Sequence, residues 1–427
     1  MHDYHGPFDP AFSLAHLSRQ ALAVLGREYL LHGHLQDRAG LPLVLARFGE
    51  DALTRIAIEE WMAASPIYSA RMQRALGFAG HDVATIFKNL QLDIGAAHQF
   101  MDFRYRLDGP RAGEFWLARC GALMDVEPFG EERVRAMCHD IEDPTFDATA
   151  AATHPCAKVR PIHRPPRVPA DREPHCHWRV FIDDEAVAYE QHPNLARVGR
   201  SRLAGVPVVE PTPGGEPGGW SDYAGPFDPD FQLEDLSHGA LVLALQEFAV
   251  QSHLLARAFL LCVGQRFGDA AALEIGAEQW AGIAGLTAER LARAMVVDGD
   301  DATAVAKLFQ LHPCFQPRTY VDLRVEVPAR DRARIAIGDC PALAEGDPYS
   351  WFATLSAAPH PALDAIARAA NPRARCHAVA AARPGTLAWD VVVDPAAAPQ
   401  PEPSGMQLAK LSTGARFVFE RRRPLRR

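Results

Sequence analysis

Residues 138–178 read CHDIEDPTFDATAAATHPCAKVRPIHRPPRVPADREPHCHW and concentrate side chains that act as nucleophiles, bases or metal ligands. They hold three cysteines and five histidines, whereas the whole chain of 427 residues has 8 and 18. A cysteine near a histidine can form a thiolate nucleophile, and the same residue types are the ligands that zinc prefers. The segment therefore predicts either a thiol-based active centre or a metal site.

In the thiol interpretation, Cys138 is the nucleophile and His139 is its first candidate base. Neighbouring residues of a helix point about 100° apart, so a histidine of the following hairpin, His163 or His177, is an alternative base. Cys120, which ends an earlier predicted strand, belongs to the same catalytic group.

In the metal interpretation, zinc or iron is bound by Cys120, Cys138, His139 and Cys176. No CxxC or HExxH spacing supports this set. Without the metal, the site needs no cofactor.

A third interpretation treats the cysteines as small buried apolar side chains and the histidines as part of a solvent-facing hairpin. In the predicted strand HCHWRV the period of two places His175 and His177 on one face. Cys176 then shares the other face with Trp178, so these side chains cannot all bind one ion.

The sequence contains an internal repeat. DYHGPFDPAFSLAHLS begins at residue 3, and DYAGPFDPDFQLEDLS begins at residue 222. The match continues through the chain and ends with HWRVFID in the first copy and AWDVVVD in the second. A period this long indicates a duplicated domain rather than a solenoid. We expect the two copies to pack as a pseudo-dimer, the fused form of a homodimer.

The repeat sets the predicted domains. Residues 1–200 form the first, active repeat, residues 201–221 a Pro- and Gly-rich linker, residues 222–396 the second, degenerate repeat, and residues 397–427 a Pro-rich and basic tail. Each repeat begins with helices and continues with two hairpins, which predicts an α+β fold with an N-terminal helical layer and a small antiparallel sheet. Helices are expected from Asp9-Pro10 and from Ser65-Pro66, and residues 415–420 are a possible strand.

Polar residues that recur in both copies give a second group of candidates. His34 matches His253, and Glu59 matches Glu278, whereas the neighbouring Glu60 has become Gln279, as a surface position can. Glu59 lies beside the apolar stripe of its helix, and a carboxylate there needs a partner. We expect His34 and Glu59 to form either a structural pair or a substrate-binding pair on the helical side, facing Cys176 and His177.

Composition and charge limit the classes of binding partner and the cellular locations that we expect for this protein. The formal net charge is −9, and the only basic cluster is the terminal RRRPLRR, expected to be a solvated tail, so no nucleic-acid partner is predicted. The start MHDYHGPFDP lacks the features of a signal peptide. The apolar stretches fall short of the ~20 residues of a membrane span. Eight widely spaced cysteines indicate reduced thiols, which predicts a cytoplasmic protein.

The order of these motifs resembles a known family. FGEDALTRIAIEEW, a strand ending in Cys120, MCHDIEDPTFDA, HPCAKVRPIHR and PHCHW together resemble the L-2-amino-thiazoline-4-carboxylic acid hydrolase-like family and its bacterial and archaeal relatives. Cys120, Cys138 and Cys176 stand at the family's cysteine positions. The resemblance implies hydrolysis of a small cyclic C–N bond with a cysteine as nucleophile.

Taken together, the sequence predicts a hydrolase-type enzyme that acts on a small organic, amidine-like substrate in the first repeat. Cys138 and His139 do not recur in the second copy, so the fold itself does not need them. A metal-dependent enzyme using the same residues and a non-enzymatic small-molecule or redox sensor remain the alternatives.

Overall fold

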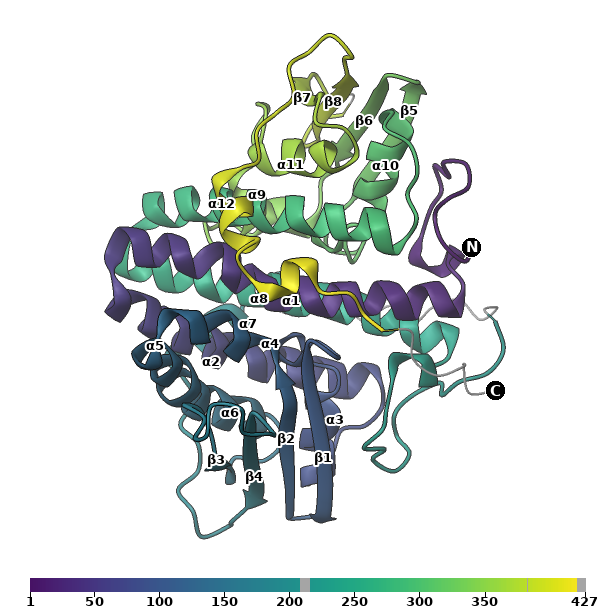
Figure 1. The fold of residues 1–427 in the computed structure, drawn as a ribbon. Helices are drawn as coiled ribbons and strands as arrows, with labels where there is room; N and C mark the ends of the chain where they lie inside the picture. Colours follow the sequence, from purple (N-terminus) through teal and green to yellow (C-terminus); the bar gives the residue numbers. More distant parts are fainter. Residues whose placement is uncertain (208–215, 382, 421–427) are drawn as a thin grey trace.

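The computed structural model describes residues 1–207, 216–381 and 383–420. They form an α+β protein in which two four-stranded antiparallel sheets lie at opposite ends of a layer of long helices (Figure 1). The first half of the chain forms the sheet with strand order β1–β2–β4–β3, and the second half forms the sheet β5–β6–β8–β7. The predicted α+β fold class is confirmed.

The elements of the first half follow the predicted order of helices before strands. Their bounds are α1 Arg19–Phe48, α2 Glu50–Ala75, α3 Val83–Leu90, β1 Met101–Gly109, β2 Ala112–Cys120, α4 Gly121–Val126, α5 Glu131–Arg135, a π-helix Ala136–Ile141, α6 Glu142–Ala151, β3 Ala157–His163, β4 Cys176–Ile182 and α7 Pro193–Gly199.

The second half repeats the leading elements with equal lengths, since α1 and α8 have 30 residues each and α2 and α9 have 26 each. Between its second and third strands, two 3-10 helices and α11 replace the longer helical segment of the first half. The bounds are α8 His238–Phe267, α9 Asp269–Ala294, α10 Ala302–Leu311, β5 Leu323–Ala329, β6 Arg332–Ile337, η7 Pro341–Ala344, η8 Trp351–Thr354, α11 Pro361–Ala370, β7 Ala374–Val379, β8 Leu387–Val393 and α12 Ser404–Ala409.

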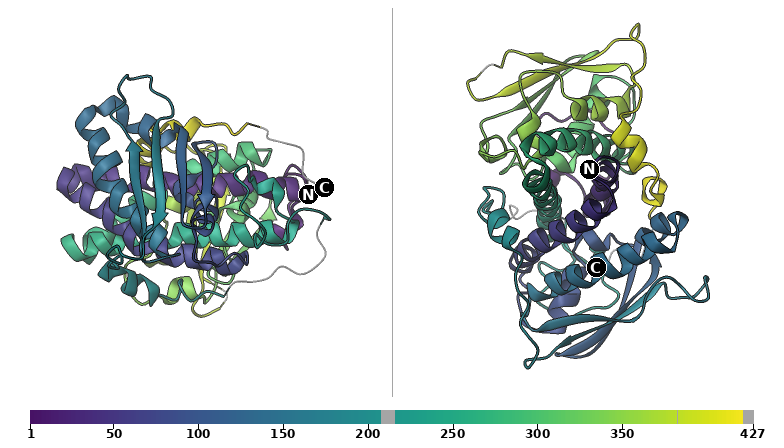
Figure 2. Two further views of the ribbon diagram at one scale, coloured as in Figure 1. Left: turned by 90° about the horizontal axis from the view of Figure 1, so that it is seen from below. Right: turned by 90° about the vertical axis from the view of Figure 1, so that its left-hand side faces the viewer.

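The central helices are buried on nearly all sides because each packs against its own half and the other half. Figure 2 shows them end-on between the two sheets. Among the described helices, α8 has the length and apolar composition of a membrane span, and 89% of that window is buried inside the protein. Its apolar character is explained by this central position.

Two predicted helix starts are wrong. The first long helix begins at Arg19 rather than at Asp9-Pro10, because the Ser18 hydroxyl caps it by accepting from the Ala21 N–H at 3.2 Å. The Ser65-Pro66 pair lies inside α2, which continues to Ala75. A proline inside a helix costs about 3 kcal/mol, and the packing of α2 against α8, with ion pairs before and after Pro66, offsets that cost.

The strands agree better with the sequence. The two predicted hairpins form as β1–β2 and β3–β4, and β4 has Cys176 and Trp178 on its buried face, as predicted. The possible strand at residues 415–420 is wrong, since no strand is assigned there. Residues 208–215 of the predicted linker and the basic residues 421–427 lie outside the described residues.

Matching contacts join the two halves. Arg71 pairs with Glu247 at 2.7 Å, and Arg290 pairs with Glu28 at 2.7 Å; both pairs are buried. Tyr4 bonds Gln310 in the second half, and Tyr223 bonds Gln91 in the first.

The rings of Phe48 and Phe267, which end α1 and α8 at the same place in the two halves, stack with centroids 3.6 Å apart. Residues at matching places in the two halves thus contact each other directly.

Each half ends in an extended arm that bridges both halves. The first arm is residues 193–206, and the second arm is residues 404–420. Arg71 binds the carbonyl oxygens of Ala204 and Val206 in the first arm, at 3.0 and 2.8 Å. Arg290 binds those of Gly414, Ala415 and Phe417 in the second arm.

Each arm also donates hydrogen bonds to a carboxylate of the other half. Glu345 accepts from the backbone of the first arm, and Asp125 accepts from Ser412 and Thr413 of the second.

Candidate functional site

The three predicted cysteines of the first half come together beneath its sheet. Cys120 ends β2, Cys176 begins β4 opposite Leu117, and Cys138 lies in the π-helix that crosses this end of the sheet. The other two thiols contribute to the raised pKa of Cys138, after burial and Glu142. π-helical turns are frequent at functional sites.

These thiols are not activated. Burial raises the pKa of Cys120 to about 12, with Glu142 adding to the effect. Burial likewise raises the pKa of Cys138 and of Cys176 well above the ordinary thiol value, again with Glu142 as the next cause. The Cys120 sulfur already accepts from the Leu123 N–H at 3.3 Å and caps α4. The environment therefore favours protonated thiols over thiolates.

The predicted bases are engaged elsewhere. His139 contacts the carbonyl oxygen of Pro165 at 2.7 Å, and His177 contacts Glu114 at 2.8 Å on the outer face of the sheet. His163 lies beside His177, with ring centroids 6.1 Å apart. The structure brings the three cysteines together but leaves His139 and His177 with other partners.

The metal-ligand set Cys120, Cys138, His139 and Cys176 does not assemble. Within residues 1–207, 216–381 and 383–420, no group of three or more His, Cys, Asp or Glu side chains is arranged to hold a metal ion. The contact of His139 with Pro165 accounts for its absence from such a group.

The predicted pair of His34 and Glu59 does not form. Glu59 instead makes an ion pair with Arg266 of the second half, and Glu278 makes the matching pair with Arg47. Both glutamates recur in the sequence because both join the two halves.

His34 faces a cavity of about 140 Å³ in the first half. The cavity lies between α1, α2, the π-helix with α6, and the inner face of the sheet. Its wall is mainly apolar, and its titratable or charged members are His34, Asp37, Arg38, Asp93 and Glu142. Ligand sites commonly combine an apolar wall with a few polar groups. An apolar cavity of about 150 Å³ is large enough for benzene, so this one fits a small ligand.

Several polar atoms at the cavity lack partners. Neither ring nitrogen of His34 has a hydrogen bond of normal geometry among the described residues, although the backbone of Gly95 lies near and favours its protonation. One oxygen of Asp37 accepts from Trp61 Nε1 at 3.1 Å, and the other has no described partner. His34 is 7% exposed and Asp37 8%. Such unsatisfied groups are costly in a native protein and call for an explanation.

Burial separates the pKa values around the cavity. It raises the pKa of Asp37 to about 6, against the opposing effects of Arg38 and the Trp61 hydrogen bond. It raises the pKa of Glu142 to about 8, opposed by Arg164, and lowers the pKa of His34 to about 3, assisted by Arg38. Two carboxyl groups whose pKa values lie on either side of 7 can act as a base and an acid.

Asp37, Arg38 and Glu60 were missed as functional candidates by the sequence analysis, and Glu142 was not among the predicted site residues. Glu60 is fully buried with both oxygens unpartnered among the described residues, and burial together with Asp37 raises its pKa well above the ordinary value of 4.5. A signal was present, because the second half has Ala256 in the place of Asp37 and Gln279 in the place of Glu60. These differences mark where the first half differs in chemistry from the second.

In the second half, the matching space is filled. Trp351 of η8 lies 6.2 Å from Trp280 and 5.8 Å from His253 between ring centroids, and its indole N–H donates to Gln279 at 3.0 Å. These three residues match Trp61, His34 and Glu60 of the first half. Trp351 thus occupies this space and bonds Gln279, and His253 contacts the carbonyl oxygen of Gln316 at 3.1 Å, whereas the matching Glu60 and His34 have no such partners among the described residues.

The second arm contacts residues that pack against the cavity wall. Asp125 accepts from Arg38 at 3.1 Å and from Ser412 and Thr413 at 2.5–2.7 Å. Phe417 packs edge-on against Phe100, which packs against His34 in turn.

Comparison with known proteins adds no identification: no family model matches the chain, and neither a curated protein nor a solved structure does.

Proposed function

We propose that the chain is a hydrolase-type enzyme that acts on a small organic substrate bound in the first-half cavity. The observation that carries this proposal is the cavity itself, where His34 and Asp37 present unpartnered polar atoms. In the second half, His253 contacts the Gln316 carbonyl oxygen, and Ala256 stands in the place of Asp37. The substrate is of benzene-like size with a hydrolysable C–N bond, in keeping with the resemblance noted from the sequence.

The proposed chemistry is proton transfer by carboxyl groups. Asp37, ionised above pH 6, accepts a proton from the attacking water. Glu142, protonated below pH 8, donates a proton to the leaving nitrogen. His34 stays neutral and orients the substrate or the water through its free ring nitrogens. Cys120, Cys138 and Cys176 form apolar packing beside this group rather than the nucleophile of the sequence-based hypothesis.

A screen of small cyclic amidines, thiazolines and lactams for turnover tests the proposal. Asp37→Asn and Glu142→Gln are expected to lower kcat/KM by about 10²- to 10⁴-fold, whereas Cys138→Ser retains turnover. Glu59→Gln serves as a matched control, because its carboxylate lies in the pair with Arg266. Loss of turnover in Cys138→Ser, with ligand binding and folding retained, would replace this mechanism by the thiol mechanism.

A small-molecule sensor is the second candidate, and the burial of the three thiols and of His34 favours it. Saturable binding at the cavity, abolished by Asp37→Asn and accompanied by no turnover of any compound, would establish the sensor instead.

We also propose that the two halves arose by tandem duplication and pack as a pseudo-dimer. The matching pairs Arg71–Glu247 and Arg290–Glu28 support this proposal, as does the stack of Phe48 on Phe267. Membership of the L-2-amino-thiazoline-4-carboxylic acid hydrolase-like family and a cytoplasmic location remain proposals from the sequence.

A further inference from the structure

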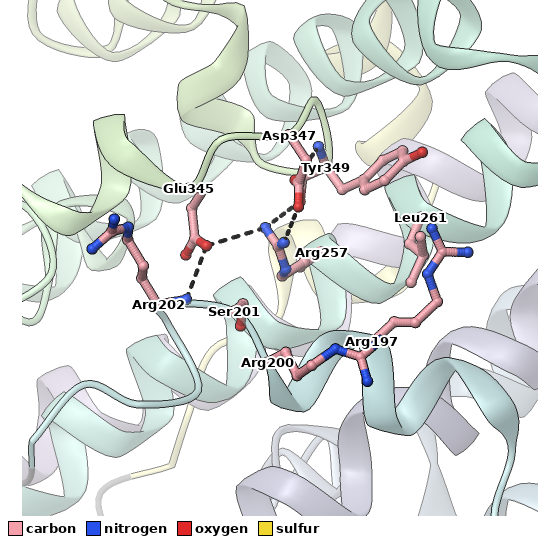
Figure 3. A pocket seen from close by; sticks show the side chains of 9 residues that line it. All are labelled: Arg197, Arg200, Ser201, Arg202, Arg257, Leu261, Glu345, Asp347 and Tyr349. Carbon is pink, nitrogen blue, oxygen red and sulfur yellow. Dashed lines mark hydrogen bonds and ion pairs between the residues drawn. The ribbon is translucent and has the colours of Figure 1, made fainter.

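A second hollow lies away from the first-half cavity, between the first arm and the second half. Its volume is about 450 Å³. Figure 3 shows Arg197, Arg200 and Arg202 extending from the arm, and Arg257 of α8 in the centre with Glu345 and Asp347 next to it. This hollow is called the arginine cleft below.

The two carboxylates of the arginine cleft are already engaged. Glu345 accepts from the backbone N–H groups of Arg202 and Leu203 at 3.0 and 2.9 Å, and lies 3.6 Å from Arg257. Asp347 pairs with Arg257 and accepts from the Tyr349 N–H at 3.0 Å. Arg257 is buried between them, so these three charges form a closed group.

The remaining arginines are not neutralised. Arg197 and Arg200 are exposed and make no side-chain hydrogen bond or ion pair with any described residue, and the Arg202 guanidinium donates to the carbonyl oxygen of Ala344 at 2.5 Å. Arg197 and Arg200 therefore bring two unpaired positive charges to the cleft in a chain whose net charge is −9.

The second arm provides an internal comparison for the first. Thr413 occupies the place of Arg202, because the backbone N–H of each donates to the carboxylate of the opposite half. In the same register, Leu408 and Leu411 stand in the places of Arg197 and Arg200. The second arm docks without these arginines, so docking of the arm does not explain them.

We propose that the arginine cleft binds a small molecule that carries a phosphate group. Guanidinium groups match phosphate oxygens through paired hydrogen bonds, and Arg197 and Arg200 are the groups available to make them. The cleft volume falls within the range of small-molecule sites. Leu261 and the ring of Tyr349 complete its wall and provide an apolar contact for the rest of the ligand. This site is independent of the chemistry proposed for the cavity.

Calorimetric titration of the full chain with inorganic pyrophosphate tests the proposal. We expect saturable binding that weakens as salt is added, since exposed charges are screened. The variant R197L/R200L, which installs the residues of the second arm, is expected to weaken binding about tenfold or more. R324A/R330A removes the same charge at exposed positions outside the cleft and is expected to bind like the unmodified chain.

Thermal unfolding verifies that the variants fold. If R197L/R200L does not fold, the single variants R197Q and R200Q are titrated with pyrophosphate instead, and each is expected to bind it more weakly. Absence of saturable binding by the unmodified chain, or equal weakening in R324A/R330A, overturns the proposal. Flotation with vesicles containing phosphatidic acid distinguishes the source of the phosphate. Binding to vesicles that R197L/R200L abolishes, without binding of pyrophosphate, overturns the small-molecule ligand and assigns the phosphate to a lipid headgroup.

Discussion

Burial decides which titratable side chains of the first half can exchange protons near neutral pH. Removal from water disfavours the charged form of every group, and it therefore raises the pKa values of thiols and carboxyls and lowers those of imidazoles. The pKa values of Cys138 and His34 shift away from neutral pH, whereas those of Asp37 and Glu142 shift towards it. The same burial that disables the cysteine as a nucleophile prepares the carboxyls for proton transfer.

The pH profile of turnover follows from these two carboxyls. We expect kcat/KM to rise as Asp37 ionises near pH 6 and to fall as Glu142 ionises near pH 8. Glu142→Gln should remove the alkaline limb from the residual activity, and Asp37→Asn the acidic limb. A profile that still rises above pH 9 in the unmodified enzyme would point to a thiolate instead.

Because the pKa of the buried Glu60 carboxyl is raised, we expect the stability of the fold to depend on pH. A carboxyl whose pKa is raised on folding favours the folded state below its unfolded pKa, and this contribution is lost as the pH rises towards the folded value. Glu60→Gln should therefore leave the free energy of unfolding nearly unchanged at pH 4 and raise it by about 1–2 kcal/mol at pH 8. Urea unfolding at both pH values measures this, with Glu59→Gln as the control that should show no such gain.

At the scale of elements, the segment between the second and third strands distinguishes the two halves. In the first half it contains the π-helix and α6, whose side chains form one wall of the cavity. In the second half η8 carries Trp351 into the matching space. One replaced segment thus closes one site while the surrounding helices and sheet keep their arrangement.

Trp351→Ala should reopen the space in the second half. We expect a loss of about 3–5 kcal/mol in the free energy of unfolding, as for other buried tryptophans. A cavity bordered by His253, Gln279 and Trp280 should then bind a small apolar probe. Thermal unfolding with and without indole measures the effect, and the unmodified chain, in which Trp351 fills this space, is the control. Failure of indole to stabilise the variant would show that the surroundings collapse into the space.

At the scale of the whole molecule, the halves are joined by buried charge pairs and by the arms. Arg71 and Arg290 each neutralise a glutamate of the opposite half and bind carbonyl oxygens of one arm. The second arm then reaches Asp125, which holds Arg38 at the cavity. The second half therefore supports the first-half cavity although its own counterpart is filled.

Removal of either buried arginine should destabilise the whole chain. Arg71→Met and Arg290→Met each leave a glutamate buried and unpaired, and we expect each to lower the free energy of unfolding by about 3–5 kcal/mol. Arg47→Met breaks a more exposed pair between the halves and should cost less than about 1 kcal/mol. Equal losses in all three variants, measured by urea unfolding, would contradict the distinction between buried and exposed pairs.

The sequence by itself determined the α+β class, the order of elements, the hairpins and the placement of His177 on the face of its strand opposite Cys176, although His177 was also expected to bind the substrate. These features depend on local periodicity and turn residues, which act over a few positions. It also indicated that the two halves differ in chemistry, through cysteines and histidines that do not recur.

Only the tertiary structure decided which side chains meet. Glu59 recurs because it contacts Arg266 in the other half, and Glu60, expected at the surface, is buried beside Asp37. The cavity lies among elements distant in sequence, and Trp351 closes its counterpart from a segment with no match in the first half. Proton affinities depend on desolvation and on neighbouring charges in space, and neither can be obtained from spacing along the chain.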